Sequence, residues 1–313
     1  MQDPKHMQGL LIGRRMDGRD FYLPPVSRLE HALIGGKTGT GKSGLTAAIA
    51  AELARCPDVA LIGIDLKLME LALWRPRLTA LANTADEASL LLALVVAEIV
   101  RRNQLLESLG LRYWDPRHGP WIVLFVDELA RLAGIAVEHL LDQANASTET
   151  DPTTGRPVKL DTNLARQAKD ALAVRMALID WIVAVGRAAG IRLIAATQYP
   201  TADVIDSNIR SQFGLRFMLR VISREQVAVI LGAGNEQHIQ PDSIPVTERG
   251  GFWCVGNPGD PRATRGRAFM FNDTTLTNRF RSTSHLRIDQ TQVFKADPTP
   301  HLHAVPTRKG QPQ

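Results

Sequence analysis

The sequence predicts an α/β fold in which a mostly parallel central sheet is flanked by helices. Three observations lead to this prediction. From residue 31 onward, short apolar runs of strand length alternate with longer segments of helical periodicity. The strand-like runs are almost continuously apolar, as expected for strands that helices cover on both faces. A glycine-rich segment separates the first of these runs from the first helical segment.

The elements follow one another in a regular order. Residues 10–23 contain two short strand-like runs about Asp17 and Gly18, a pair typical of a hairpin turn. Apolar runs bounded by polar residues or glycine then predict strands at 31–35, 59–65, 121–126 and 191–197. Longer periodic segments predict helices at 43–56, 86–108 and 164–189. A segment rich in Pro, Gly and Thr at 146–157 predicts an exposed loop.

These patterns divide the chain into three parts. Residues 1–30 are expected to form an N-terminal β-hairpin and linker, and residues 31–272 the main domain. The apolar periodicity fades after Asn272, and the remaining residues are rich in Pro, His, Gln and Thr. We therefore expect residues 273–313 to form a C-terminal extension that is largely disordered.

Composition narrows the class of protein. Of the 313 residues, 44% are hydrophobic and 22% are charged, which is ordinary for a globular domain. The two cysteines, Cys56 and Cys254, lie far apart with no neighbouring metal-ligand pattern, so neither a disulfide framework nor a zinc site is expected. The longest apolar run, 90–100, is too short to span a membrane, and no secretory signal begins the chain. We expect a cytoplasmic location, and the net charge of +5 permits an anionic partner.

The glycine-rich segment matches the phosphate-binding pattern G-x-x-x-x-G-K-[ST] between a strand and a helix. Glycines let successive backbone N–H groups face a phosphate, and the helix N-terminus adds positive charge. Lys42 would contact the β- and γ-phosphates, and Ser43 would bind Mg²⁺. No guanine-reading segment is present, so ATP is the expected nucleotide; the alternative is a glycine-rich turn without a ligand. The proposed ATP-binding residues are Gly36, Lys37, Thr38, Gly39, Thr40, Gly41, Lys42, Ser43 and Asp127.

Polar residues follow two of the predicted strands. Asp127 and Glu128 come directly after the strand at 121–126, and Gln198 follows the strand at 191–197. The carboxyl ends of parallel strands meet at the edge where the phosphate loop is expected. Asp127 would hold Mg²⁺ there, and Glu128 would act as general base on the attacking water. Gln198 would sense the γ-phosphate, or it would cap a helix or loop.

These segments together resemble the FtsK/SpoIIIE family of double-stranded DNA translocases, including the TraB-type plasmid transfer motors of actinomycetes. The resemblance covers about residues 9–272. The segments that carry it are His31–Ser43, Ile64–Lys67 with Glu70, Val126–Ala130, Gly186–Pro200, Asp203–Ile205 and Ile209–Arg210. The resemblance implies a RecA-like P-loop ATPase that forms a ring, usually a hexamer, around duplex DNA and moves it through the centre.

The resemblance also suggests roles for three arginines. Arg187, eleven residues before Gln198, matches an arginine that completes the neighbouring subunit's site; its alternative role is to cap the end of its helix. Arg210 and Arg224 would face the pore and contact DNA phosphates without reading bases, unless they are ordinary surface residues. No membrane anchor or sequence-reading module is recognised, which implies partner proteins that supply membrane or DNA targeting.

Two other classes of function stay open. A protein-secretion or coupling ATPase that moves polypeptide would share the fold and the phosphate site. A nucleotide-dependent scaffold would bind ATP without turnover, although Glu128 argues against it. The biological setting also stays open among conjugative plasmid transfer, excision of an integrative element and chromosome segregation.

Overall fold

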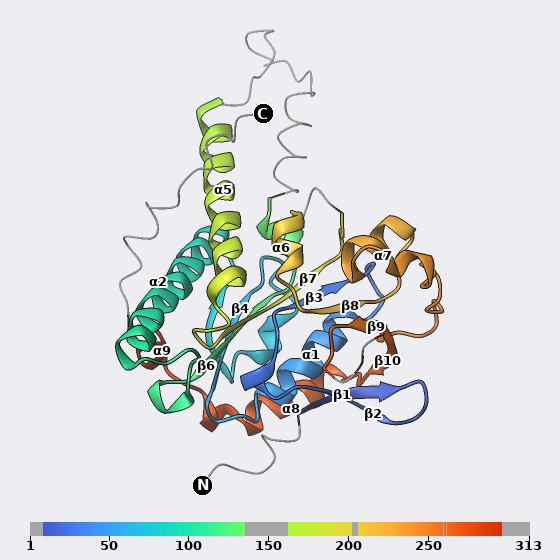
Figure 1. The fold of residues 1–313 in the computed structure, drawn as a ribbon, viewed down its shortest axis with the longest axis horizontal. Coiled ribbons are helices and arrows are strands. Elements are labelled where there is room, and N and C mark those ends of the chain that lie inside the picture. The colour runs from blue at the N-terminus through green and yellow to red at the C-terminus, as the bar shows by residue number, and fades with distance from the viewer. Residues whose placement is uncertain (1–8, 135–161, 202–205, 259, 261, 296–313) are drawn as a thin grey trace.

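The computed structural model describes residues 9–134, 162–201, 206–258, 260 and 262–295 (Figure 1). Its centre is one ten-stranded sheet in the order β2-β1-β10-β9-β8-β3-β7-β6-β4-β5. The predicted loop at 146–157 lies outside the described residues. No helix within the described ranges is long and apolar enough to span a membrane.

Six neighbouring strands are parallel, and they form the half of the sheet that carries the predicted motifs. They are β3 (Ala32–Gly35), β4 (Val59–Ile64), β5 (Leu78–Ala82), β6 (Trp121–Val126), β7 (Ile191–Thr197) and β8 (Leu215–Met218). The four strands predicted from the apolar runs are all present. They could be predicted because each run is long enough and apolar enough to be recognised by itself. The short strands β5 and β8 were not predicted.

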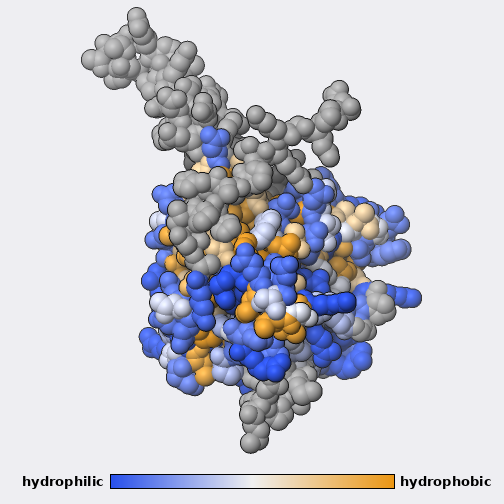
Figure 2. Space-filling model, turned by 60° about the vertical axis from the view of Figure 1, so that its left-hand side comes forward, coloured by the Kyte–Doolittle hydropathy of each residue, from blue (hydrophilic) through white to orange (hydrophobic). Residues whose placement is uncertain are grey.

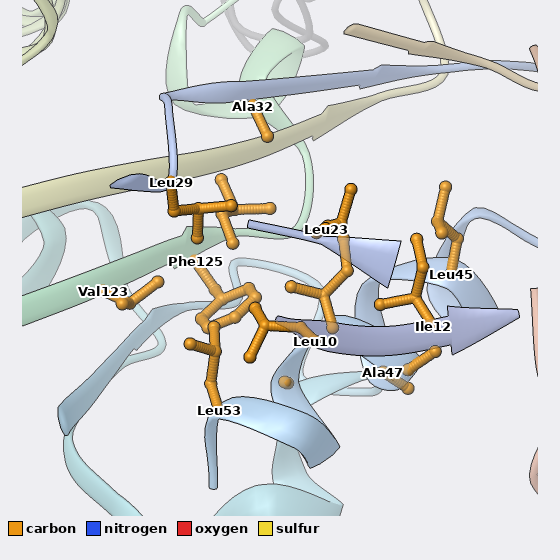
Figure 3. Packing of buried hydrophobic residues seen from close by; sticks show 14 of the residues in the cluster. Leu10, Ile12, Leu23, Leu29, Ala32, Leu45, Ala47, Leu53, Val123 and Phe125 are labelled. Atoms are coloured by element: carbon orange, nitrogen blue, oxygen red, sulfur yellow. The ribbon is translucent and has the colours of Figure 1, made fainter. Parts of the chain in front are cut away.

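The other four strands extend the sheet in antiparallel pairs. They are β1 (Leu10–Arg15), β2 (Asp20–Leu23), β9 (Gly251–Val255) and β10 (Thr264–Ala268). The hairpin of β1 and β2 pairs with β10, so it belongs to the same sheet as the main domain. Figure 3 shows Leu10, Ile12 and Leu23 of this hairpin packed beside Leu45 and Leu53.

Helices cover both faces of the sheet (Figure 1). On one face α1 (Lys42–Leu53) packs on Leu61 and Val123, and on the other α2 (Ala85–Leu109) and α5 (Thr162–Val185) pack on Ile62 and Leu124. Successive strand residues point to opposite faces, so a strand buried on both sides must be apolar throughout. The prediction of a mostly parallel sheet flanked by helices is confirmed.

Short helices complete the described chain. They are α3 (Leu129–Leu132), α6 (Ser207–Ser211), α7 (Arg224–Leu231), α8 (Asp273–Ser282) and α9 (Gln290–Val293). Single-turn 3₁₀ helices lie at Val26–Arg28, Leu71–Trp74, Pro116–His118, Asn235–Gln237 and Ser284–Leu286.

Hydrophilic residues cover much of the face shown in Figure 2, where hydrophobic residues form scattered patches.

The expectation of disorder after residue 272 is wrong for the first part of that extension. Helix α8 begins at an Asn272 side-chain cap and buries Phe280, whose ring stacks on Trp74 with centroids 5.4 Å apart. Val293 of α9 is also fully buried. These few apolar residues are too widely spaced for the sequence to show a clear helical periodicity of hydrophobicity, yet each is buried in the core. Residues 296–313 lie outside the described part.

Candidate nucleotide site

The segment between β3 and α1 forms a loop whose backbone requires glycine. Gly39 and Gly41 have φ angles of +80° and +102°, which L-residues with a side chain rarely adopt. A Cβ atom on Gly41 would also lie 2.4 Å from the backbone nitrogen of Gly250. Gly36 donates its N–H to the Thr197 carbonyl at 3.3 Å, which ties the loop to the end of β7. The glycines therefore serve both the curvature of the loop and its close packing.

Lys42 begins α1 and points back into this loop. Its Nζ donates to the carbonyl oxygens of Gly36 at 2.7 Å and Lys37 at 3.0 Å. The residue is buried, and burial lowers the pKa of the ammonium to about 8. The loop thus holds a desolvated cation whose partners are neutral carbonyls, which leaves its charge available to an anion.

The acid pair at the end of β6 lies beside the end of β7. Both carboxylate oxygens of Glu128 accept the backbone N–H of Gln198, at 3.0 and 3.2 Å. The Gln198 side-chain oxygen in turn accepts the hydroxyl of Thr38 at 2.7 Å. Gln198 therefore connects the phosphate loop with Glu128, because its side chain binds Thr38 of the loop and its backbone N–H binds Glu128.

Asp127 has a different environment from Glu128. Burial raises the pKa of Asp127 to about 6; the ammonium of Lys67 opposes this shift, and the neighbouring acids Asp65, Glu70 and Glu128 add to it. Its buried Oδ2 accepts no hydrogen bond from the residues that the structure describes. A buried carboxylate oxygen without a donor is a costly arrangement that a bound cation would relieve.

Two of the predicted residues fit a magnesium ion by their chemistry. Mg²⁺ prefers hard oxygen ligands such as carboxylates and hydroxyls. The unpartnered Oδ2 of Asp127 supplies a carboxylate oxygen, and Ser43, half-buried in the first turn of α1, supplies a hydroxyl. The donor set therefore agrees with the magnesium role expected from the sequence.

Sequence reasoning missed one charged residue at this edge. Lys67 follows β4, and its Nζ lies 3.1 Å from Glu128 Oε2 and 3.8 Å from Asp127 Oδ2. The segment Ile64–Lys67 is part of the family resemblance, but no role for the lysine follows from it. The available signal was its position: it follows a parallel strand, so it lies at the same edge as the acids.

Arg187 lies at the opposite edge of the sheet. It precedes β7, whereas Gln198 follows it, so the seven residues of the strand place about 20 Å between them. Its half-exposed side chain forms an ion pair with Glu30 at 2.5 Å. Its backbone carbonyl, not its side chain, accepts the N–H of Gly190. The structure therefore does not bring Arg187 to the phosphate loop of its own chain.

Arg210 lies in α6 and Arg224 in α7. Arg224 is the first residue of this helix, is exposed, and donates to Gln240 Oε1 at 3.0 Å. The Arg210 carbonyl accepts Arg216 Nη2, and Gly232, just after α7, lies against the same guanidinium. No hydrogen bond joins the two predicted DNA-binding residues among those that the structure describes.

Comparison with known proteins decides the family. The family model described as FtsK/SpoIIIE matches residues 4–202 of the chain. The chain belongs to the FtsK/SpoIIIE family. The TraB-like refinement stays a prediction. Two relatives, both DNA translocase FtsK, come from Rickettsia typhi and Vibrio parahaemolyticus, with identities of 29% over 259 residues and 27% over 243 residues.

The aligned part is one segment and not the whole of these relatives. It covers 75% of this FtsK/SpoIIIE chain and 33% of the Rickettsia protein, and 74% of this chain and 23% of the Vibrio protein. The chain thus spans a third or less of the length of the relatives that it matches.

Solved structures show the same fold at lower sequence identity. The pCW3 conjugation coupling protein TcpA, in a monomer form with ATPγS, is 21% identical, with a TM-score of 0.67 over 90% of this chain and 73% of TcpA. The cytoplasmic domain of the type VII secretion ATPase EccC from Thermomonospora curvata is 17% identical, with a TM-score of 0.65 over 94% of this chain and 34% of EccC. The RecA-like P-loop fold is therefore confirmed.

Proposed function

We propose that this FtsK/SpoIIIE chain is an ATP-driven motor that translocates double-stranded DNA. One observation carries the proposal: the phosphate loop, the acid pair and Gln198 converge at one edge of the sheet, joined by hydrogen bonds. A phosphate cradle beside a buried acid is the arrangement that nucleotide hydrolysis requires. The named relatives are DNA translocases, which supports DNA as the cargo.

In this proposal each residue of the site has one task. The backbone of residues 36–43 and the Lys42 ammonium bind the β- and γ-phosphates of ATP. Ser43 and Asp127 hold Mg²⁺, which neutralises phosphate charge when it is bound. Glu128, anchored by the backbone of Gln198, accepts a proton from the attacking water. The Gln198 side chain, bound to Thr38 of the loop, reports whether the γ-phosphate is present.

The position of Arg187 supports a task in a ring. An arginine about 20 Å from its own Gln198 cannot serve its own site, but it can serve the site of a neighbour in a head-to-tail ring. There it would stabilise charge that develops on the transferred phosphoryl group. We propose a homo-oligomeric ring, a hexamer as in the family, in which hydrolysis depends on assembly.

Arg210 and Arg224 are the proposed contacts with DNA. Both belong to the segment that follows Gln198, so a change at the γ-phosphate can be transmitted to them. Guanidinium groups bind phosphates without selecting bases, which suits a motor that moves along any sequence. Partner proteins would supply DNA targeting or recruitment from the cytoplasm to the membrane.

The structural likeness leaves two cargoes to separate. TcpA is a conjugation coupling protein and EccC a type VII secretion ATPase, and both share this fold at low identity. Fold alone does not decide between DNA and polypeptide. The likeness to TcpA makes conjugative transfer our proposed setting, with DNA segregation as the alternative that the FtsK relatives suggest.

The experiment measures ATP hydrolysis with and without long duplex DNA, at several salt concentrations. Stimulation by duplex DNA that exceeds stimulation by single strands, and that weakens as salt rises, is the expected result. A rate of ATP hydrolysis that DNA does not change, together with no binding of duplex DNA at low salt, would support the polypeptide motor. ATP binding without any hydrolysis would support the scaffold.

A further inference from the structure

The ammonium of Lys67 lies between the two acids of the candidate site. It is 3.1 Å from Glu128 Oε2 and 3.8 Å from Asp127 Oδ2, and its side chain is 22% exposed. The Glu128 side chain is only 3% exposed, and its other partner is the single N–H of Gln198. The Lys42 ammonium also interacts with Glu128 through space, but Lys67 is the cation that contacts this carboxylate directly among the described residues, so its removal would leave the carboxylate without a charged hydrogen-bond donor.

The loop that carries Lys67 is held in place by another acid. The buried carboxylate of Asp65 accepts the backbone N–H groups of Lys67 at 3.0 Å, Glu70 at 2.9 Å and Leu71 at 3.0 Å. Three such hydrogen bonds to a charged acceptor fix the path of the backbone. The position of the Lys67 ammonium is therefore a consequence of a rigid loop and not of a freely moving side chain alone.

The same loop contains an unusual backbone conformation. Leu68 has a φ of +62° and is the only residue other than glycine with a positive φ among those the structure describes. A leucine in this region is strained. Leu68 is 63% exposed and Met69 is 74% exposed, so the burial of apolar side chains does not offset the strain. The feature that this turn does provide is the placement of Lys67 beside the acids, and such strain is found at functional sites.

A divalent cation and the Lys67 ammonium cannot share this place without repulsion. Asp127 Oδ2 has no hydrogen-bond donor among the described residues, and Lys67 is the cation nearest to it. A magnesium ion bound at that oxygen would lie within a few ångströms of Nζ, where two cations repel strongly in a partly buried site. Cation binding and the Lys67 contact with the acids are therefore linked.

We propose that Lys67 is a positioning residue that takes the charge-neutralising place of the divalent cation while the site holds no nucleotide. In that state it keeps the Glu128 carboxylate paired and close to Gln198, so that the carboxylate is not free to accept a proton. Arrival of the cation with the nucleotide displaces the ammonium and releases Glu128. The functional importance of this displacement rests on the proposed ATPase function. The geometry from which it is inferred concerns only Lys67 and the two acids.

The test measures the binding of Mn²⁺, a paramagnetic substitute for Mg²⁺, to the full chain without nucleotide, by electron paramagnetic resonance of the free ion. Lys67→Ala should bind Mn²⁺ at least about tenfold more tightly than the unaltered protein, because a unit charge near the ion has been removed. Lys67→Arg keeps the charge and should bind Mn²⁺ as the unaltered protein does. Lys295→Ala, which removes an exposed lysine elsewhere, should also leave Mn²⁺ affinity unchanged.

A double variant locates the effect. Lys67→Ala combined with Asp127→Asn should lose the gain in Mn²⁺ affinity, because the carboxylate that binds the ion is gone. Lys67→Ala that binds Mn²⁺ no more tightly than the unaltered protein, or an equal gain in Lys67→Arg, would overturn the proposal. Because no nucleotide is present, this outcome differs from failure of the proposed function, which absence of ATP hydrolysis in the unaltered protein would show.

Discussion

Arg187 offers the sharpest test of a ring in which neighbours complete one another's sites. The strand β7 separates it from Gln198 by about 20 Å, and its side chain pairs with Glu30 at the far edge of the sheet. Replacing Arg187 with Ala should therefore leave ATP binding to the same chain unchanged. Turnover should fall by a factor of about 10³ or more, the effect of losing an arginine supplied by a neighbour.

Mixing two inactive variants distinguishes action within a chain from action between chains. Glu128→Gln retains a side chain of the same shape beside Gln198 but loses the base, so it should bind ATP and turn over at least about a hundredfold more slowly. In a mixed ring, an Arg187→Ala subunit keeps Glu128 and can receive Arg187 from a Glu128→Gln neighbour. Random mixing in equal amounts makes about a quarter of the sites complete, since each requires one of two subunit types on each side.

The assay is steady-state ATP hydrolysis by each variant alone and by the mixture, after the subunits have been dissociated and allowed to reassemble together. We expect activity in the mixture that approaches about a quarter of the unaltered rate, from two proteins that are nearly inactive alone. A mixture no more active than its components, when native subunits treated in the same way recover their activity, would refute the trans role of Arg187. Arg187 would then have a structural role, through its ion pair with Glu30.

Two further predictions concern the C-terminal segment and the DNA-binding arginines. Phe280→Ala should lower the free energy of unfolding, measured by urea denaturation, by about 3–5 kcal/mol, because the ring is fully buried against Trp74. As a control, Arg281→Ala at the exposed neighbouring position should change the free energy of unfolding by less than about 0.5 kcal/mol. Equal effects of the two substitutions would contradict the packing of α8. Arg210→Ala with Arg224→Ala should preserve ATPase activity without DNA, while the slope of log affinity against log salt for duplex binding becomes less negative by about 0.9 for each DNA phosphate that is no longer neutralised. A slope equal to that of Arg281→Ala would assign both arginines to the ordinary surface.

Part of the site could be predicted because its signals are local. A glycine-rich loop between a strand and a helix reports its own conformation, as the positive φ angles of Gly39 and Gly41 show. Asp127 and Glu128 directly follow a buried strand, so the parallel pairing of β6 with β7 was sufficient to place them beside Gln198. The hydrogen bond that the Gln198 N–H donates to Glu128, and the one that the Gln198 side-chain oxygen accepts from Thr38, then agree with an expectation drawn from strand ends alone.

Other features could not be predicted because they depend on contacts between distant segments. The pairing of β1 with β10 joins residues about 250 positions apart, and no local pattern specifies which sheet edge a hairpin will extend. Helix α8 carries two buried apolar residues, Leu276 and Phe280, in an otherwise polar segment. Their place in the core depends on packing against distant residues, as the stacking of Phe280 on Trp74 shows.

The sequence by itself determined the α/β class, the phosphate loop and the acids at the strand ends, because each depends on periodicity or on neighbours within a few residues. The tertiary structure alone decided that Lys67 stands between Asp127 and Glu128, and that Arg187 faces away from the loop of its own chain. Distances between charges are set by how strands align and how loops are pinned, as Asp65 pins the turn that carries Lys67. Those alignments arise from packing across the whole sheet, and no short stretch of sequence contains them.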